Sequence, residues 1–353
     1  NGVYGIAFRE GLHVATGIGG ECLTSVDTLV WVRQTTVTVA TNLGPVAYGD
    51  GLSVGDYANA VDLEDDALAP PPGCRKTYLA GGYFRLGSTP DGQVTADVIQ
   101  GAAAADRTAA QMGKALLTRA GKTAADWSAA DIAKLDAEMF DVLGYWTAEE
   151  TTVADVLDLV MGSVGAWWGV DRTGIYRFRQ LVAPSGTPAI ELTAHDLLVP
   201  LVRQVTNDPG RGVPAWRTIL RYDRNYTVQT TDLATSVTDA RRTWLAKDRR
   251  EVVVDTAGVL TEHLLAPVME YDTLLTTYAD ALDEATRRNV LRRVHRDPFL
   301  AVVPLTSETL AVDLGDIVWL THSRYDLAAG KPFVLLEIRP DALGRKLEWT
   351  LWG

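Results

Sequence analysis

Cysteine, histidine and basic charge are scarce in this sequence of 353 residues. The two cysteines, Cys22 and Cys74, form no Cys-x-x-Cys pair and are too few to build a metal cage. Lysine and arginine number 33 against 45 acidic residues, so the formal net charge is −12. A protein that binds nucleic acid needs a basic surplus to neutralise phosphates, and this balance argues against that main role. No apolar run approaches the roughly 18 residues that a membrane helix needs.

Hydrophobic residues make up 47% of the chain and charged residues 22%, which is enough apolar material for real cores. A chain of this length predicts two or three domains. The first residue is Asn1 rather than methionine, from which we expect a processed chain or part of a longer one.

Motifs for catalysis or cofactor binding are few. Gly17-Ile18-Gly19-Gly20 begins like a phosphate loop, but Cys22 stands where the third glycine of the pattern should be. Glu64-Asp65-Asp66 could bind a cation, although it lacks the spacing of a calcium loop and fits a solvated acidic turn better. The histidines show no zinc-binding spacing; they are His13, His195, His263, His295 and His322. We therefore predict no catalytic, cofactor-binding or metal-binding residues, no cofactor and no enzymatic activity.

The first hundred residues are predicted to be rich in β-structure. Residues 28–31 and 35–40 carry β-branched runs, with period-two alternation in Thr36-Val37-Thr38-Val39, and residues 78–86 form a further β-like, aromatic stretch. Asp62 to Gly73 is acidic and then proline-rich, which predicts a loop because proline is excluded from the centre of a sheet.

Three helices and a hairpin are predicted next. Residues 102–119 form the first helix, with Gly121 at its C-terminal end, and Ser128 caps a second helix. The third helix covers residues 151–162, and Asp171-Arg172-Thr173-Gly174 joins strands 166–170 and 175–181. The predicted buried positions of these helices are Met112, Leu116 and Leu117, then Ile132, Leu135 and Phe140, then Val153, Val156, Leu157 and Val160, with Thr151 or Thr152 as the third cap.

A second β-rich region follows, with a long helix over residues 274–293. In the last strand Trp349 and Leu351 point one way and Trp352 the other, which predicts a strand covered on both faces. The other predicted elements are strands 197–205, 216–223, 251–255, 300–304, 317–322, 333–339 and 346–351 and a helix over 239–250. The predicted apolar side of the long helix holds Leu275, Tyr278, Leu282, Ala285, Val290 and Leu291.

Two groups of side chains have alternative interpretations. One is a basic stripe of Arg287, Arg288, Arg292, Arg293 and Arg296; it could face nucleic acid, but an exposed helix face paired with Asp280, Asp283 and Glu284 explains it better. The other is a set of tryptophans, which could mark a contact site but which we expect to be mostly core: Trp127, Trp146, Trp167, Trp168, Trp216 and Trp244.

The order of elements predicts an α+β protein rather than a doubly wound sheet. We divide it into a β-rich N-terminal region (1–98), a helical segment (99–150), a small α/β domain (151–189) and a second β domain with a long helix (190–353).

Several segments together resemble tailed-bacteriophage tail proteins. The first is Gly81-Gly82-Tyr83-Phe84-Arg85-Leu86-Gly87, and the last is the closing Leu351-Trp352-Gly353. Between them, in the same order as in that family, lie residues 90–97, 115–121 with Asp126 and Ile132, 164–167 with Asp171 and Gly174, 210–217, 222–229, 314–316 and 338–341. The resemblance covers about residues 78–353.

The resemblance implies a tail-tip or baseplate hub protein, with tail-tube-like β-barrel domains decorated by smaller domains. It implies a structural, non-enzymatic chain that forms a homo-oligomeric ring, a trimer, in the virion tail after assembly in the host cytoplasm. Its expected partners are a tube or distal tail protein, a fibre or tip protein and the tape measure, with DNA passing only transiently through the bore. We expect more acidic than basic side chains along that bore, and we expect residues 17–20 and 62–66 to become ordered against a neighbour. The alternatives are a receptor-binding or tail-fibre adaptor protein and a tail-associated cell-wall or polysaccharide hydrolase.

Overall fold

The computed structural model describes residues 6–9, 12–16, 22–25, 32–34, 53–70, 75–78, 83–87, 103–204, 212–231, 233 and 237–353. The chain divides into two compact units, Asn1–Arg107 with Arg224–Arg249, and Thr108–Asp223 with Arg250–Gly353. The predictions for residues 17–20, 28–31 and 35–40 lie outside the described residues. The four-part division of the sequence stays a prediction.

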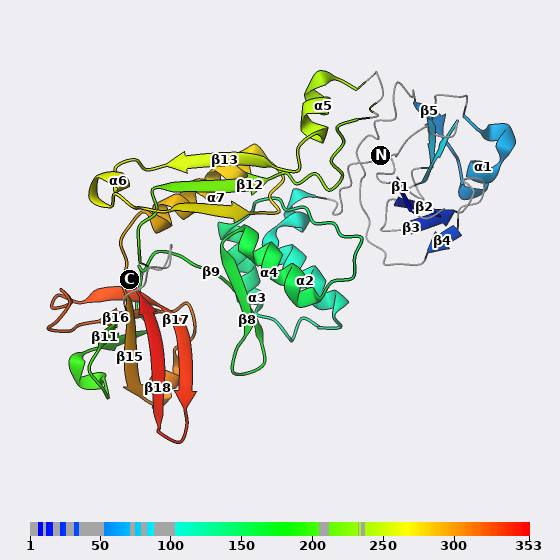
Figure 1. Ribbon diagram of the computed structural model, residues 1–353. Helices are drawn as coiled ribbons and strands as arrows, with labels where there is room; N and C mark the ends of the chain where they lie inside the picture. Colours follow the sequence, from blue (N-terminus) through cyan, green and yellow to red (C-terminus); the bar gives the residue numbers. More distant parts are fainter. Residues whose placement is uncertain are drawn as a thin grey trace. The chain divides into compact units, whose positions relative to one another are not determined.

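The first unit contains two small sheets (Figure 1). Four strands pair in sequence order as an antiparallel meander: β1 (Ile6–Arg9), β2 (Leu12–Thr16), β3 (Cys22–Ser25) and β4 (Val32–Gln34). The second sheet has the order β5 (Ser53–Asp56), β6 (Arg75–Tyr78) and β7 (Tyr83–Leu86). Helix α5 (Asp239–Leu245) and the 3-10 helix η2 (Ala104–Arg107) also belong to this unit.

The acidic segment predicted to be a loop is helical instead. Helix α1 (Ala60–Glu64) begins at Asn59, whose side chain accepts hydrogen bonds from the backbone N–H groups of Val61 and Asp62. Asp65 then caps the 3-10 helix η1 (Asp66–Leu68). The cap and the burial of Leu63 stabilise local structure that acidic composition alone does not indicate. Residues 62–66 therefore fold within their own unit.

The helical part of the second unit matches the predicted caps closely. Helices α2 (Ala109–Arg119), α3 (Ala129–Glu138) and α4 (Val153–Ser163) begin after Thr108, Ser128 and Thr152, whose hydroxyls accept backbone hydrogen bonds. Gly121 ends α2 at φ +79°, with Lys122 N–H donating to the Leu117 carbonyl. Phe140 was predicted to be buried on α3, but it lies beyond the helix end and is 71% exposed.

The predicted hairpin is present as β8 (Ala166–Val170) and β9 (Tyr176–Gln180). A three-stranded sheet follows, in the order β13 (Arg250–Asp255), β12 (Arg217–Tyr222) and β14 (Val268–Asp272). The predicted helix 239–250 is therefore wrong in its last part, because Arg250 begins β13 beside β12. The short helix α6 (Val259–Glu262) connects β13 to β14.

Helix α7 (Tyr278–Arg292) packs on one face of this three-stranded sheet (Figure 1). It begins after the cap Thr277, later than predicted. Its apolar side is also predicted wrongly at two positions, because Tyr278 and Val290 are 58% and 46% exposed. One hydrophobic cluster nevertheless joins α2, α3, α4, the hairpin, the three-stranded sheet and α7.

The C-terminal sheet has six strands in the order β10, β16, β17, β18, β15, β11. Among the described residues of the predicted strand 197–205, only Val202–Arg203 forms a strand. These two residues pair with Leu300 and Phe299 of β15. The bounds are β10 (Ile190–Leu192), β11 (Val202–Arg203), β15 (Pro298–Pro304), β16 (Ile317–Leu320), β17 (Lys331–Asp341) and β18 (Lys346–Trp352), with η3 (Ala194–Asp196) and α8 (Ser307–Ala311) between strands.

Both faces of β18 are covered, as its alternation predicted. Trp349 and Leu351 are completely buried in the cluster that fills the sheet. Trp352 is buried on the other face, against Leu291 of α7 and Val334 of β17. The described chain is thus an α+β protein. Among the described residues, no helix is long and apolar enough to cross a membrane.

Candidate functional site

Four clusters of polar side chains connect elements in the described part of the second unit. The first is the α7 node, formed by Glu284, Arg287 and Arg288. The Glu284 carboxylate is fully buried, and Arg287 donates to it through Nε at 2.7 Å and Nη2 at 2.8 Å. Arg288 donates from Nε to Oε1 of the same carboxylate. The node carries one net positive charge inside the protein, because two guanidinium groups share one carboxylate.

The two arginines of the α7 node also bind the C-terminal end of α4. Arg288 Nη2 donates to the Gly162 carbonyl at 2.6 Å, and Arg287 Nη2 donates to the Val164 carbonyl at 3.2 Å. The last carbonyls of a helix have no partners within the helix and carry partial negative charge, so arginine satisfies both needs. The prediction that the basic stripe is an exposed face is therefore wrong for Arg288, which is buried, and for Arg287, which is one quarter exposed.

A buried carboxyl group lies close to this node. Asp141 is 8% exposed, and burial raises its pKa to about 6, with added repulsion from Asp280, Glu284 and Asp283. An aspartate in this position titrates two pH units above its usual range. The described region therefore holds one carboxyl group whose charge changes near neutral pH.

The second place is the hairpin joint, formed by Arg177 and Arg179 of β9 with Asp131, Asp313 and Asp316. Arg177 donates to both oxygens of Asp131, at 2.5 and 3.1 Å, and to Asp313 at 3.3 Å. Arg179 donates to Asp316 at 2.9 Å and to the Leu314 carbonyl. The hairpin thereby connects α3 to the segment that leads into β16.

The turn of the same hairpin is fixed by Asp171. Its Oδ1 accepts hydrogen bonds from the Thr173 hydroxyl at 2.6 Å, the Thr173 N–H at 2.8 Å and the Ile175 N–H at 3.1 Å. The Thr173 hydroxyl, together with the backbone N–H groups of Ile175 and Thr173, lowers the pKa of Asp171 to about 2. Gly174 completes the turn at φ +87°, which glycine adopts without strain. The predicted turn chemistry is confirmed.

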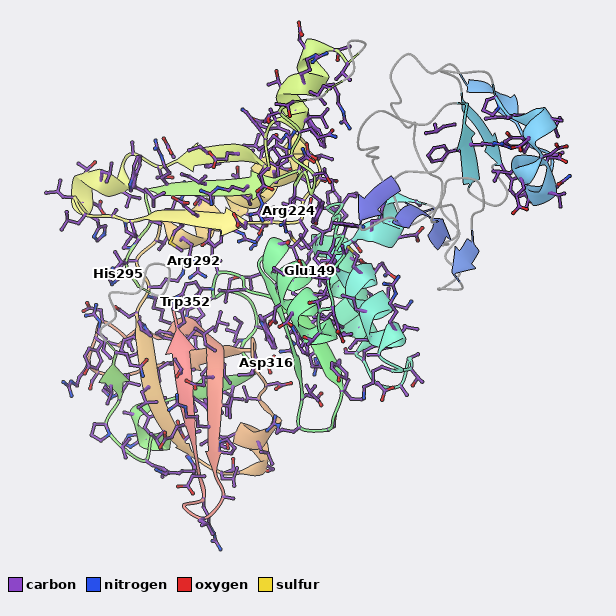
Figure 2. The ribbon with its side chains drawn as sticks, turned by 45° about the vertical axis from the view of Figure 1, so that its right-hand side comes forward. Glu149, Arg224, Arg292, His295, Asp316 and Trp352 are labelled. Atoms are coloured by element: carbon purple, nitrogen blue, oxygen red, sulfur yellow. The ribbon has the colours of Figure 1, made fainter. Side chains whose placement is uncertain are left out.

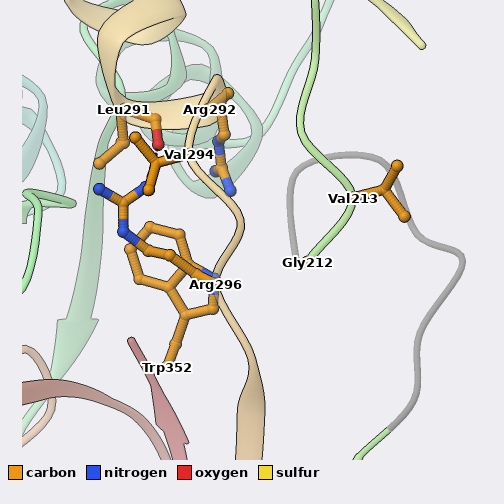
Figure 3. A pocket seen from close by; sticks show the side chains of 7 residues that line it. All are labelled: Gly212, Val213, Leu291, Arg292, Val294, Arg296 and Trp352. Carbon is orange, nitrogen blue, oxygen red and sulfur yellow. Dashed lines mark hydrogen bonds between the residues drawn. The ribbon is translucent and has the colours of Figure 1, made fainter. Parts of the chain in front are cut away.

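The third place is the arginine socket, formed by Arg292, Arg296 and Trp352. Both arginines lie beside the buried Trp352 ring, with guanidinium carbons 5.6 and 4.8 Å from its centroid (Figure 3). Figure 2 labels Arg292 and Trp352 on the whole chain. They line a shallow hollow that is open to solvent, with Val213 and Val294 also at its wall. Burial lowers the pKa of both arginines. Among the described residues, no carboxylate pairs with either guanidinium.

The fourth place is the outer sheet face, on the side of the three-stranded sheet away from α7. Arg221 at its centre donates to Glu251 at 2.8 Å, Glu270 at 2.6 Å and Asp272 at 3.3 Å. The register of the sheet places these residues on neighbouring strands, so the ion pairs follow from strand pairing. All of them are between one third and about half exposed.

The histidines and the acidic segment Glu64-Asp65-Asp66 do not form a metal or catalytic site within the described residues. Within the described ranges, no three His, Cys, Asp or Glu side chains could hold a metal ion. His263 and His295 stack at 6.1 Å, but His295 pairs with Asp297 at 3.1 Å. His195 lies in η3, far from these in sequence. Glu64 and Asp66 end α1 and begin η1, so the Glu64-Asp65-Asp66 segment is a helix junction.

The sequence also contains one nucleophile-elbow spacing, Gly51-Leu52-Ser53-Val54-Gly55. An elbow places its serine at the turn where a strand ends and a helix begins. Ser53 instead begins strand β5 and pairs with Arg75 of β6. From Ser53 to Asp56 the backbone is therefore a strand and not the turn into a helix that an elbow needs.

The tryptophans differ from the core that the sequence predicted. Of the six, Trp127 is buried, Trp146 is 48% exposed, and Trp167, Trp168, Trp216 and Trp244 are half-buried. A two-stranded hairpin covers only part of the large rings at positions 167 and 168. The fully buried pair is Trp349 and Trp352.

No family model matches the chain, and no curated protein matches it. Solved structures of virion and tail proteins do overlap with it. A chain of the virion of a native gene transfer agent particle aligns at TM-score 0.45 and 16% identity, over 69% of this chain and 46% of that chain's length. The tail protein from Neisseria meningitidis MC58 aligns at TM-score 0.42 and 10% identity, over 99% and 90%. The 43 kDa tail protein of prophage MuSo2 from Shewanella oneidensis aligns at 0.38 and 11%, over 70% and 66%. At these values we base function on the residues of this chain.

Proposed function

We propose that this chain is a structural component of a bacteriophage tail tip or baseplate hub, which joins the tail tube to the host-contacting tip. The observation that carries the proposal is where the tail-protein motifs lie in the fold. Within the described residues of the second unit, the motifs at 164–167, 314–316 and 351–353 lie at contacts between secondary-structure elements. Residues at such contacts hold the fold together, which supports a structural role.

Each of these motifs holds a joint. The Val164 carbonyl accepts from Gln180 Nε2 and Arg287 Nη2, both at 3.2 Å. Gly315, at φ +83°, lies where an added Cβ would come within 3.4 Å of Arg179 and Trp167. The Gly353 carbonyl accepts from the Asp297 N–H at 2.9 Å. The requirement for glycine at position 315 comes from its positive φ, because an added Cβ would make only ordinary contacts with the two side chains.

The finer parts of the proposal follow from the same resemblance. The chain acts as a ring, most simply a trimer, whose β domains resemble tail-tube barrels and surround part of the DNA conduit. A net charge of −12 suits such a wall, because a basic bore would hold phosphates and slow DNA passage. Its partners are a tube or distal tail protein, a fibre or tip protein and the tape measure.

A nonsense codon in the gene for this chain tests the proposal in the phage that carries it. We expect non-suppressing hosts to yield filled heads without functional tails, and suppressing hosts to restore whole particles. Antibody labelling of whole particles should mark the end of the tail far from the head. Normal tails in the absence of the chain would contradict the proposal.

The two alternatives make different demands. A hydrolase would turn over peptidoglycan or capsule polysaccharide with the isolated chain, and one carboxylate substitution would abolish the turnover. A receptor-binding adaptor would bind host cells, and substitution of the exposed Trp146 would be expected to weaken that binding. Both assays run on the same purified protein.

A further inference from the structure

The arginine socket is the part of the basic stripe that no internal ion pair explains. Arg287 and Arg288 are bound to Glu284 and to the carbonyls of α4. Arg292, by contrast, has no carboxylate partner among the described residues. Arg296 is 9% exposed, and one of its nitrogens donates to the Leu291 carbonyl at the end of α7. The two neighbouring cations thus have neutral partners, the Tyr271 side chain for Arg292 and the Leu291 carbonyl for Arg296, and no anionic partner among the described residues.

The energetics of burial favour an anionic partner at this place. A guanidinium group withdrawn from water without a counter-charge destabilises the folded state, and two such groups side by side add mutual repulsion. The Trp352 ring compensates in part through cation–π attraction. A carboxylate could accept hydrogen bonds from both guanidinium groups, since guanidinium and carboxylate groups match in bidentate geometry.

The surroundings favour a protein carboxylate over a nucleic-acid phosphate. The hollow beside the two arginines is shallow and open to solvent, so a ligand would meet the guanidinium groups at the surface and not in an enclosed cavity. At its wall Val294 is 49% exposed, which gives an apolar rim beside the arginines. Arginine and tryptophan surrounded by such a rim are the composition typical of interface hot spots. DNA would instead need a row of exposed cations along its backbone.

We propose that Arg292, Arg296 and Trp352 form a socket that binds an acidic side chain of a second copy of this chain. The chain itself has 45 acidic residues against 33 basic ones, so its own surface offers an excess of carboxylates. A socket on one copy and an acid elsewhere on the next make a head-to-tail contact, which closes a ring when the rotation fits. The inference rests on the proposed function, because a ring requires neighbouring copies.

The test is sedimentation equilibrium of the purified full chain, up to about 100 µM. The wild-type chain should self-associate, and Arg292→Gln should weaken that association by about tenfold or more, as expected for loss of a charged hydrogen bond. Arg293→Gln is the matched control: it removes the same charge from the neighbouring, exposed position and should change the association by less than about twofold. Arg292→Lys keeps the charge but loses the fork, and should fall between the two.

Thermal melting followed by circular dichroism shows whether each variant is folded. If Arg292→Gln does not fold, the self-association of Arg292→Lys is compared with that of the wild type instead. A wild-type chain that stays monomeric, or equal weakening by Arg292→Gln and Arg293→Gln, would overturn the socket. Added inorganic phosphate, compared with chloride at equal ionic strength, should compete in the wild type only. Binding of a labelled DNA duplex that Arg292→Gln abolishes, without self-association, would assign the socket to phosphate instead. Failure of the socket leaves particle assembly in the nonsense-codon experiment unaffected, so the two proposals fail separately.

Discussion

Glu284 on α7 and Glu251 on β13 each accept a hydrogen bond from an arginine Nε, at 2.7 and 2.8 Å. The Glu284 side chain is completely buried, whereas the Glu251 side chain is 52% exposed. The two contacts have the same chemistry and nearly the same length. They differ in exposure to solvent, and Glu284 is shared by two arginines whereas Arg221 is shared by three acids.

This difference decides how much each pair matters. Around Glu284, loss of the carboxylate would leave two cations inside the protein, where no water can replace it. Around Glu251, water and the neighbouring acids replace a lost partner at little cost. Ion-pair distance is therefore a poor guide to stability in this chain, and burial is the better one.

The largest effect is expected from Glu284→Gln. The substitution keeps the shape but removes the charge that Arg287 and Arg288 share, and breaking a buried pair costs about 3–5 kcal/mol. Urea unfolding followed by circular dichroism measures the loss. Glu251→Gln is the matched control and should leave the unfolding midpoint almost unchanged. Equal effects of the two substitutions would show that burial does not separate the sites.

The hairpin joint should give the next largest effect. Arg177 is 22% exposed and binds Asp131, Asp171 and Asp313, so it lies between the two extremes. Arg177→Gln should lower the free energy of unfolding by about 2–3 kcal/mol, on the scale of hydrogen bonds to charged groups. Arg339→Gln, at a pair whose arginine is 69% exposed, serves as the control. A neutral Arg177→Gln would show that the joint does not hold the C-terminal sheet.

Local signals account for what the sequence predicts correctly. The cap of α4 at Thr152, the turn at Asp171-Arg172-Thr173-Gly174 and the alternating pattern of β18 each depend on residues that are close in sequence. Such signals are visible in one sequence because cap, turn and pleat geometry fix them. Residues 62–66 were predicted wrongly because acidic composition masked the cap at Asn59.

The candidate sites depend on contacts that sequence alone does not indicate. The basic stripe on α7 is visible as a pattern, and its interpretation as an exposed face follows from the usual position of arginine. Two partners bury Arg288. One is the Gly162 carbonyl, 126 residues away in the sequence, and the other is the Tyr271 ring on strand β14. The socket likewise needs Trp352 beside Arg292, and these meet only when β18 packs against α7.

Asp141 is a buried carboxyl group for which the cost of burial outweighs the attraction of Arg287. Its pKa is about 6 in the folded chain and close to 4 in an unfolded one. Between these pH values the folded chain holds a proton that the unfolded chain has lost, so stability falls as pH rises from about 4 to 6. Above pH 6 the full penalty of the buried charge is present.

Asp141→Asn should therefore stabilise the chain at pH 7.5 by about 2 kcal/mol and have little effect near pH 4. Unfolding midpoints measured at both pH values give the result, with the exposed Glu138→Gln as a control at each. The same gain at pH 4 and pH 7.5 would mean that the effect comes from packing rather than from charge.

The smallest effect is expected at the centre of the outer sheet face. The Arg221 side chain is about one third exposed, so water can reach it. Its hydrogen bonds to Glu251, Glu270 and Asp272 raise its pKa, but water can replace them at little cost to stability. Arg221→Gln should shift the unfolding midpoint of the isolated chain by no more than the error of the measurement, at low and at moderate salt. The same substitution in assembled particles gives the sharper comparison. If particles lose heat resistance while the isolated chain does not, a neighbouring protein excludes water from this face, and Arg221 then belongs with Glu284 among the buried charges.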